Sequence, residues 1–159
     1  MPPRPKGRGI HAVILMKALL QRVSKAQVEV DQTVIGSIGA GLLLFLGIHT
    51  QDDTSCVDYL VDKVVNLRIF SDKDGKMNLS LLDVKGSVLL VSQFTLYGDC
   101  QTGRRPSFTE SAKSDVAKPL YEYFIKELRK KCLVETGEFG ANMQVNLIND
   151  GPVTLILEK

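Results

Sequence analysis

The sequence predicts an α+β domain in which a largely antiparallel, barrel-like β-sheet is covered by two helices. Its 159 residues suit one domain whose core is large enough to fold without disulfides or metals. Several segments alternate apolar and polar residues, as strands with one buried face do, and two have apolar residues at helical spacing. In chain order these segments form a hairpin, a strand, a helix, further strands, a helix and two strands, which is typical of the α+β class.

Residues 1–15 are predicted to be a flexible N-terminal extension or tag, and residues 16–159 to be the folded domain. Proline and glycine occupy five of the first nine positions, and the stretch MKALLQRV, from Met16, looks like the start of the domain. The extension has Arg4, Lys6 and Arg8 and no acidic residue, so a transit peptide is the alternative interpretation. Its shortness and its lack of serine count against that alternative.

The first half of the domain is predicted to hold a hairpin, a buried strand and a helix. Apolar and polar residues alternate on both sides of Asp31-Gln32, which indicates a hairpin from Val28 to Gly39. Residues 41–48 (GLLLFLGI) follow as a fully buried strand. A helix is expected after residues 52–54, which are N-cap residue types. Its apolar residues recur at helical spacing and are Val57, Leu60, Val61, Val64 and Val65.

The middle of the chain is predicted to hold two strands, a long loop and the second helix. A short strand is expected near residues 77–82, and residues 87–96 are predicted to be one central strand because of their β-branched content. Residues 97–114 have no hydrophobic period, so they are predicted to form a surface loop of the kind that often carries function. The second helix is expected to begin at about Pro119, which suits a first helical position. Its apolar face is Leu120, Phe124, Leu128 and Cys132.

Two strands are predicted at the C-terminal end, over residues 143–149 and 153–158. Asp150, Gly151 and Pro152 interrupt them, because proline cannot donate a hydrogen bond to a sheet and glycine weakens a strand interior.

Composition and charge exclude several classes of protein. The longest apolar run, residues 42–46, is far shorter than the roughly 20 residues that a membrane span requires. The net charge is +2 and the extension contributes +3, so the folded domain has a charge of −1 and is not a globally basic nucleic-acid binder. Cys56, Cys100 and Cys132 predict neither a disulfide framework nor a zinc site, which favours a reducing, cytosolic setting.

Conventional catalytic motifs are absent from the sequence. His11 and His49 are the only histidines, and His49 is interpreted as a structural or strand-end residue rather than a general base. Polar Ser92, Gln93 and Thr95 nevertheless follow an apolar strand. Such residues can form a site or can simply satisfy hydrogen bonds at a strand end, and the residues alone leave both readings open. Thr95 as a nucleophile would need an adjacent base.

Several motifs together identify a family. The stretches MKALLQRVSKAQVEVD, IGAGLLLFLGI, MNLSLL, SVLLVSQFTLYGD, RRPSF and MQVNLINDGPVT occur in this order over residues 16–159. In this the chain resembles the D-aminoacyl-tRNA deacylases, proofreading enzymes that hydrolyse the ester joining a D-amino acid to tRNA. The SQFTL and NDGPVT stretches are the most specific.

The resemblance implies a homodimer with its active sites at the subunit interface. The Gly151-Pro152 bond would be cis, and its carbonyls would line the partner's pocket as a chirality gate. An L side chain would collide with such a gate, whereas a D side chain would point away, so the gate would discriminate by exclusion. Mischarged glycyl-tRNA would pass the gate and would also be hydrolysed.

The resemblance also implies which residues hold the substrate. Phe94 and nearby backbone N–H groups would position the terminal adenosine and the ester carbonyl. Residues carried over from the family as catalytic are Ser92, Gln93, Phe94 and Thr95. Residues carried over as supporting are Arg22, which would brace the gate, Met143, which would line the pocket, and Asn149.

The implied chemistry uses neither a cofactor nor a metal. The neighbouring 2′-hydroxyl of the ribose would assist the attack of water, and Thr95 as a covalent nucleophile is the competing mechanism. Arg104 and Arg105 are expected either to grip tRNA phosphates or to be a solvated basic pair. The expected location is cytoplasmic, without a membrane partner.

Two alternatives to the D-specific deacylase remain open. One is a related deacylase with a trans Gly-Pro bond that corrects tRNA mischarged with L-amino acids, although the Ser92-Gln93 pair resembles the D-specific branch. The other is a non-catalytic RNA-binding module.

Overall fold

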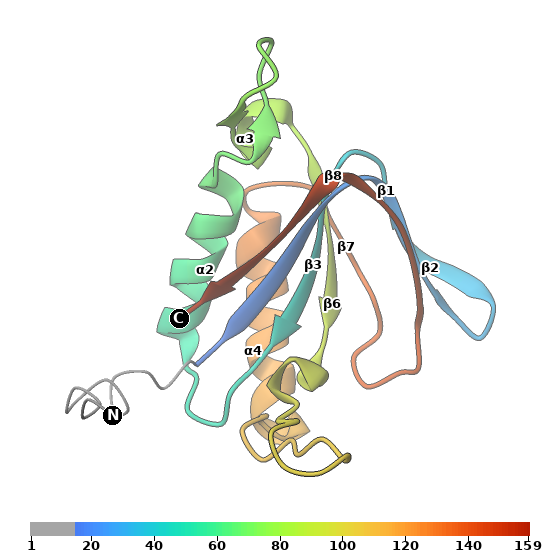
Figure 1. Ribbon diagram of the computed structural model, residues 1–159, viewed down its shortest axis with the longest axis vertical. Coiled ribbons are helices and arrows are strands. Elements are labelled where there is room, and N and C mark those ends of the chain that lie inside the picture. Colours follow the sequence, from blue (N-terminus) through green and yellow to red (C-terminus); the bar gives the residue numbers. More distant parts are fainter. Residues whose placement is uncertain (1–14) are drawn as a thin grey trace.

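The computed structural model describes residues 15–159, which form a curved, nearly closed sheet with two long helices on one side (Figure 1). The predicted extension therefore lies outside the described residues except for Leu15. The strands are β1 (Lys17–Val30), β2 (Thr33–Ile38), β3 (Gly41–Gly47), β4 (Phe70–Ser71), β5 (Met77–Leu79), β6 (Ser87–Ser92), β7 (Val134–Thr136) and β8 (Gln144–Glu158). The helices are α2 (Thr54–Asn66), α3 (Leu81–Val84) and α4 (Ser114–Arg129), and a 3-10 turn, η1, spans Phe94–Tyr97.

The long strand β1 organises the sheet. One of its edges pairs with β2 and β3, so that Ala26 lies opposite Ile38 and Val23 opposite Gly41, and the register with β2 shifts between Val28 and Glu29. β8 covers the other edge of β1 along almost its whole length. The β1–β2 turn has Asp31 and Gln32 at φ 49° and 65°, as a tight two-residue hairpin turn requires, and this confirms the predicted hairpin.

The sheet is mixed rather than purely antiparallel. β3 pairs with β6 and β6 with β7 in parallel, while the pairs around β1 are antiparallel. β2 approaches β7 from the other end of the sheet, and a side chain at Gly36 would lie 2.7 Å from the carbonyl oxygen of Thr136. This close approach nearly closes the barrel, so the barrel-like α+β architecture predicted from the sequence is confirmed.

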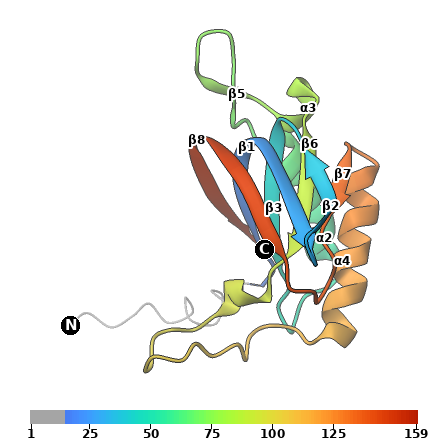
Figure 2. The ribbon, with the colours of Figure 1, turned by 90° about the vertical axis from the view of Figure 1, so that its right-hand side faces the viewer.

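Two hydrophobic cores hold these layers together. The larger one lies between the sheet and helices α2 and α4, which cover the same side of the sheet (Figure 2). The smaller one lies inside the curved sheet and includes Val23, Val28, Leu43, Leu89 and Val91. Because β3 and β6 contribute side chains to both cores, they are buried on both faces, which explains their unbroken apolar sequences.

Helix α2 agrees with the prediction, whereas the predicted start of α4 is wrong. α2 begins after Asp53, whose side chain accepts a hydrogen bond from the Ser55 N–H at 2.9 Å. α4 begins at Ser114, so Pro119 lies inside the helix rather than at its first position. Lys113 precedes the helix without a side-chain cap, and Pro119 in the second turn removes only one internal hydrogen bond.

Three strand predictions also need correction. The segment near residues 77–82 is a strand only to Leu79, because Ser80 and Asp83 form a capping box that starts α3. The central strand predicted over residues 87–96 ends at Ser92, and η1 then turns the chain over the end of β3. Residues 144–158 form one strand with an internal bulge rather than two strands.

In the described part of the chain, none of the helices has the length and apolar character needed to cross a membrane.

Candidate active site

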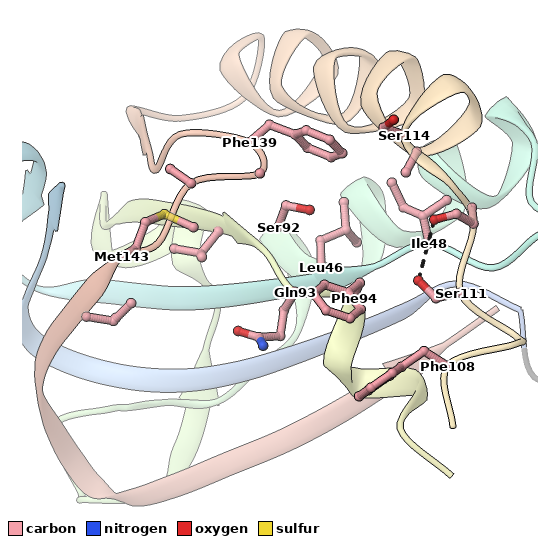
Figure 3. Close-up of a pocket in the computed structure, with 16 residues that line it drawn as sticks. Leu46, Ile48, Ser92, Gln93, Phe94, Phe108, Ser111, Ser114, Phe139 and Met143 are labelled. Atoms are coloured by element: carbon pink, nitrogen blue, oxygen red, sulfur yellow. Dashed lines mark hydrogen bonds between the residues drawn. The ribbon is translucent and has the colours of Figure 1, made fainter. Parts of the chain in front are cut away.

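A cavity of about 490 Å³ lies beyond the carboxyl ends of the parallel strands β3 and β6 (Figure 3). The start of α4, the loop before it and the loop before β8 form its other walls. The residues that line it are Leu46, Ile48, Val91, Ser92, Gln93, Phe94, Phe108, Ser111, Ala112, Ser114, Ala117, Phe139, Gly140, Ala141, Met143 and Val145. Carboxyl ends of parallel strands are a common place for ligand sites, because polar groups are released there from the sheet.

The SQFT stretch forms one side of the cavity. The Gln93 N–H donates to the Leu46 carbonyl at 2.8 Å, which is the last bond before the chain leaves the sheet. Phe94 then opens η1, with its side chain 56% exposed and in edge contact with Phe108 at 5.1 Å between ring centroids. Ser92, Gln93 and Phe94 therefore border the cavity together.

Thr95 does not line the cavity. Its side chain is exposed, and its hydroxyl accepts a hydrogen bond from the Gln93 side-chain amide. An amide cannot remove a proton from a hydroxyl, so this contact does not activate Thr95 as a nucleophile.

The cavity lining is uncharged. Among the described residues that border the cavity, the polar side chains are Ser92, Gln93, Ser111 and Ser114, and none is acidic, basic, a histidine or a cysteine. The lining therefore supplies hydrogen bonds and apolar contacts, but no titratable side chain that could act as a general base.

The NDGP stretch forms a bulge in β8. Thr154 lies opposite Gln21 and Asn149 lies opposite Val23, so residues 150–153 on β8 face Arg22 alone on β1. These four residues are called the β8 bulge below. The Gly151-Pro152 peptide bond is cis, and both residues are exposed.

Two side chains hold the β8 bulge in place. Buried Arg22 donates from Nε to the Asp150 carbonyl and from Nη1 to the Ile69 carbonyl, both at 2.8 Å. The Asn149 side chain accepts from the Val153 N–H at 2.8 Å and donates to the Val153 carbonyl at 3.0 Å. These bonds replace the sheet hydrogen bonds that the bulge interrupts. The backbone groups of Asp150 and Val153, on either side of the exposed Gly151-Pro152 pair, therefore have hydrogen-bond partners.

Within one chain, the β8 bulge and the cavity are separate. Arg22 pairs with Leu42 near the start of β3, whereas the cavity lies beyond the end of β3. Neither Gly151 nor Pro152 borders the cavity. A single subunit thus brings together Ser92, Gln93, Phe94 and Met143, and it keeps the β8 bulge apart from them.

The sequence is similar to known deacylases over nearly its whole length. The family model described as D-Tyr-tRNA(Tyr) deacylase matches residues 19–158. The chain belongs to this deacylase family. Two D-aminoacyl-tRNA deacylases, from Thermosipho melanesiensis and Clostridioides difficile, are 59% and 54% identical to it, each over 90% of this chain and 97% of the relative. The family predicted from the motifs is thereby confirmed, and with it the assignment of the protein as a hydrolase.

Two solved structures have a fold similar to that of this chain. A structure described as c-Myc DNA Unwinding Element Binding Protein is 40% identical and superposes with a TM-score of 0.85, covering 90% of this chain and 98% of that one. A structure described as a probable eukaryotic D-amino acid tRNA deacylase has a TM-score of 0.79 over 91% of this chain and 99% of that one. At 17% identity, it supports the fold alone.

The basic pair of the deacylase lies outside the cavity. Arg104 and Arg105 are exposed at the tip of the loop between η1 and α4, and neither borders the cavity. Both side chains are accessible to a ligand, and their contact with tRNA phosphates stays a prediction.

Sequence reasoning missed the cavity walls formed by Phe108, Ser111 and Phe139. Phe108 ends the RRPSF stretch, but no motif indicated that these three residues line a cavity, because they reach it through the folding of two loops.

His49 is buried, as a structural histidine would be, and does not border the cavity. The neighbouring Asp52 accepts the His49 backbone N–H at 2.7 Å, and burial nevertheless raises the pKa of its carboxyl group to about 6.

Proposed function

We propose that this deacylase hydrolyses the ester of D-aminoacyl-tRNA and of mischarged glycyl-tRNA, with Gly151 and Pro152 of a partner subunit acting as the chirality gate. The observation that carries the proposal is the β8 bulge: an exposed Gly-Pro corner, braced from below by Arg22 and Asn149. A gate that excludes L side chains by collision must be rigid, and the hydrogen bonds from Arg22 and Asn149 hold the backbone of the bulge in place.

The gate requires a second copy of the chain, and β8 offers a surface for one. Ile148, Leu155 and Ile156 are exposed on this edge strand to 50%, 38% and 55%. An uncovered apolar edge strand is a hazard for a single chain, which a dimer partner would remove. The separation of the β8 bulge from the cavity within one chain supports the same arrangement, because only a partner's bulge would complete the site.

The uncharged cavity supports an RNA-assisted reaction. Water attacks the ester carbonyl, the ribose oxygen leaves with a proton, and the products are the free amino acid and tRNA. With no titratable side chain on the described cavity lining, the neighbouring 2′-hydroxyl of the substrate is the group that assists the water. The first backbone N–H groups of η1, at Phe94 and Thr95, would stabilise the developing oxyanion.

Substrate contacts follow from the same geometry. Phe94, Ser92 and Gln93 would hold the terminal adenosine, with Met143 on the cavity wall. Arg104 and Arg105 would contact phosphates of the acceptor end, which would make binding salt-dependent. The proposed tRNA substrate supports a cytoplasmic location, where the translation machinery is found.

The direct test measures ester loss from matched D-tyrosyl-, L-tyrosyl- and glycyl-tRNA. We expect hydrolysis of the D-tyrosyl and glycyl esters and little hydrolysis of the L-tyrosyl ester. Equal hydrolysis of the D and L forms would refute the gate, and binding of all three without hydrolysis would support the RNA-binding alternative. Sedimentation of the protein at assay concentration tests the dimer independently, and a monomer that discriminates D from L would refute the cross-subunit gate.

A further inference from the structure

The segment 108–112 forms a wall of the cavity and is fastened to the chain just after β3. The Ala112 N–H donates to the Ile48 carbonyl at 2.8 Å, and the Thr50 N–H donates to the Glu110 carbonyl at 3.2 Å. His49 and Ser111 form an isolated antiparallel bridge between these two bonds. Within residues 15–159, this short ladder and one side-chain contact are the hydrogen-bonded links between the segment and the chain just after β3.

That side-chain contact joins His49 and Glu110. The His49 ring is buried, with 3% of the residue exposed, and its Nδ1 accepts the Gln51 N–H at 3.1 Å. An Nδ1 that accepts leaves the ring proton on Nε2, and Nε2 is the atom hydrogen-bonded to Glu110. Tyr97 packs edge-on against the ring at 5.7 Å, so the histidine is held on several sides.

We propose that His49 and Glu110 form a clasp that positions the cavity wall, and that Glu110 is a positioning residue for substrate binding. The proposal rests on the deacylase function proposed above. The Glu110 side chain is 62% exposed and does not border the cavity, so it acts on the substrate only through the segment that it fastens.

The clasp acts through Phe108 and Ser111. Both border the cavity, and Phe108 is the ring against which the exposed Phe94 rests. When the clasp is open, the wall is less ordered, and binding the substrate must first order it. That cost falls equally on bound substrate and transition state, so it raises KM and leaves kcat unchanged.

The test compares Glu110→Ala, Glu110→Gln and a control, Glu122→Ala, on the exposed face of α4. We expect E110A to raise KM for D-tyrosyl-tRNA about fivefold, with kcat within about twofold of the unmodified enzyme. E110Q should restore KM, because the glutamine oxygen still accepts from His49 Nε2. E122A should match the unmodified enzyme, because Glu122 is exposed and does not border the cavity.

The direction of the change separates the clasp from a general charge effect. Removing a negative charge beside bound RNA weakens repulsion and lowers KM, whereas opening the clasp raises it. An unchanged or lowered KM in E110A, or an E110Q variant as impaired as E110A, would overturn the clasp. A lower kcat at unchanged KM would overturn it as well.

A second comparison uses the partner side chain. His49→Gln combined with E110A should raise KM no further than H49Q alone, because both changes open the same contact. Additive increases would overturn the clasp. None of these outcomes bears on whether the unmodified enzyme prefers D substrates, so the clasp and the proposed function fail separately.

Discussion

The β8 bulge and the SQFT side of the cavity differ in how their polar groups are satisfied. In the bulge, Arg22 and Asn149 supply bonds to the backbone of Asp150 and Val153, so little is left for a ligand to complete. At the cavity, Phe94 is half exposed, and Ser92 and Gln93 border the open volume, where the Gln93 amide is bonded to the exposed Thr95 hydroxyl. The contrast indicates different roles. The rigid bulge is suited to excluding L side chains, whereas the polar groups at the cavity are available to form hydrogen bonds when substrate binds.

Removing the arginine brace should have the largest effect. Arg22→Ala leaves two backbone carbonyls, of Asp150 and Ile69, without their charged donor. We expect the free energy of unfolding to fall by about 4 kcal/mol and the ratio of D to L hydrolysis to fall at least about tenfold. Urea unfolding and the paired tRNA assay measure these changes. Arg22→Lys is the matched variant, and it should recover only part of both because an ammonium lacks the planar fork.

Asp52, which is hydrogen-bonded to the clasp residue His49, should give the protein a distinctive pH dependence. Burial raises its pKa to about 6, above the usual 3.8, so the folded state holds the proton more tightly than the unfolded state. Its contribution therefore favours folding below about pH 4 and is lost as the pH rises to about 6, a change of up to about 3 kcal/mol.

The variant Asp52→Asn isolates this contribution. It keeps an oxygen to accept the His49 N–H and cannot ionise. Relative to the unmodified protein, it should gain stability between pH 4 and pH 6 in urea unfolding. The pKa values of Asp53 and Asp83 are lowered by hydrogen bonds and act in the opposite sense, but they cancel in this comparison. A pH-independent difference would contradict the burial of an ionised Asp52.

The amide brace should matter less than the arginine brace. Asn149→Ala removes the bonds to the Val153 N–H and carbonyl while Arg22 remains. We expect a loss of about 2 kcal/mol in unfolding free energy and a smaller fall in the D/L ratio than for R22A. Asn149→Asp keeps the acceptor but places a carboxylate oxygen against the Val153 carbonyl, so it should not restore the amide's effect. An unchanged D/L ratio in N149A would show that Arg22 alone makes the bulge stiff.

The smallest effect is expected for Thr95→Ala. The Thr95 hydroxyl is exposed, bonded to the Gln93 amide and outside the cavity lining. Turnover of D-tyrosyl-tRNA should stay within about threefold of the unmodified enzyme in single-turnover assays. Loss of all turnover would instead favour the covalent nucleophile.

Regular patterns in the sequence predicted the elements whose residues repeat. The alternation around Asp31-Gln32 and the helical spacing from Val57 to Val65 are local properties, and both elements form as expected. The end of β6 at Ser92 was not predictable, because η1 is fixed by Tyr97, whose buried hydroxyl reaches the Gly47 carbonyl at 3.1 Å. The predicted start of α4 was wrong because Lys113, which precedes the helix, makes no side-chain cap and so gives no signal in the sequence.

The candidate site could be predicted only where it carries a specific motif. SQFT and NDGP were found because their residues are consecutive, and Arg22 and Asn149 followed from the family resemblance. Phe108, Ser111 and Phe139 were missed, since contacts between loops distant in sequence bring them together. The β8 bulge appeared as an interruption between two strands, because a bond from Arg22, 128 positions away from Asp150, satisfies its backbone.

The uncharged lining of the cavity has a consequence for how the rate of reaction depends on pH. An enzyme that relies on a histidine or carboxylate base shows a rate that rises or falls around that group's pKa. Because no described residue bordering this cavity has an acidic or basic side chain, the lining supplies no general base whose titration would produce such an inflection between about pH 6 and 8. Curvature in that range would come from the aminoacyl ester and its RNA, or from groups outside the lining such as Asp52.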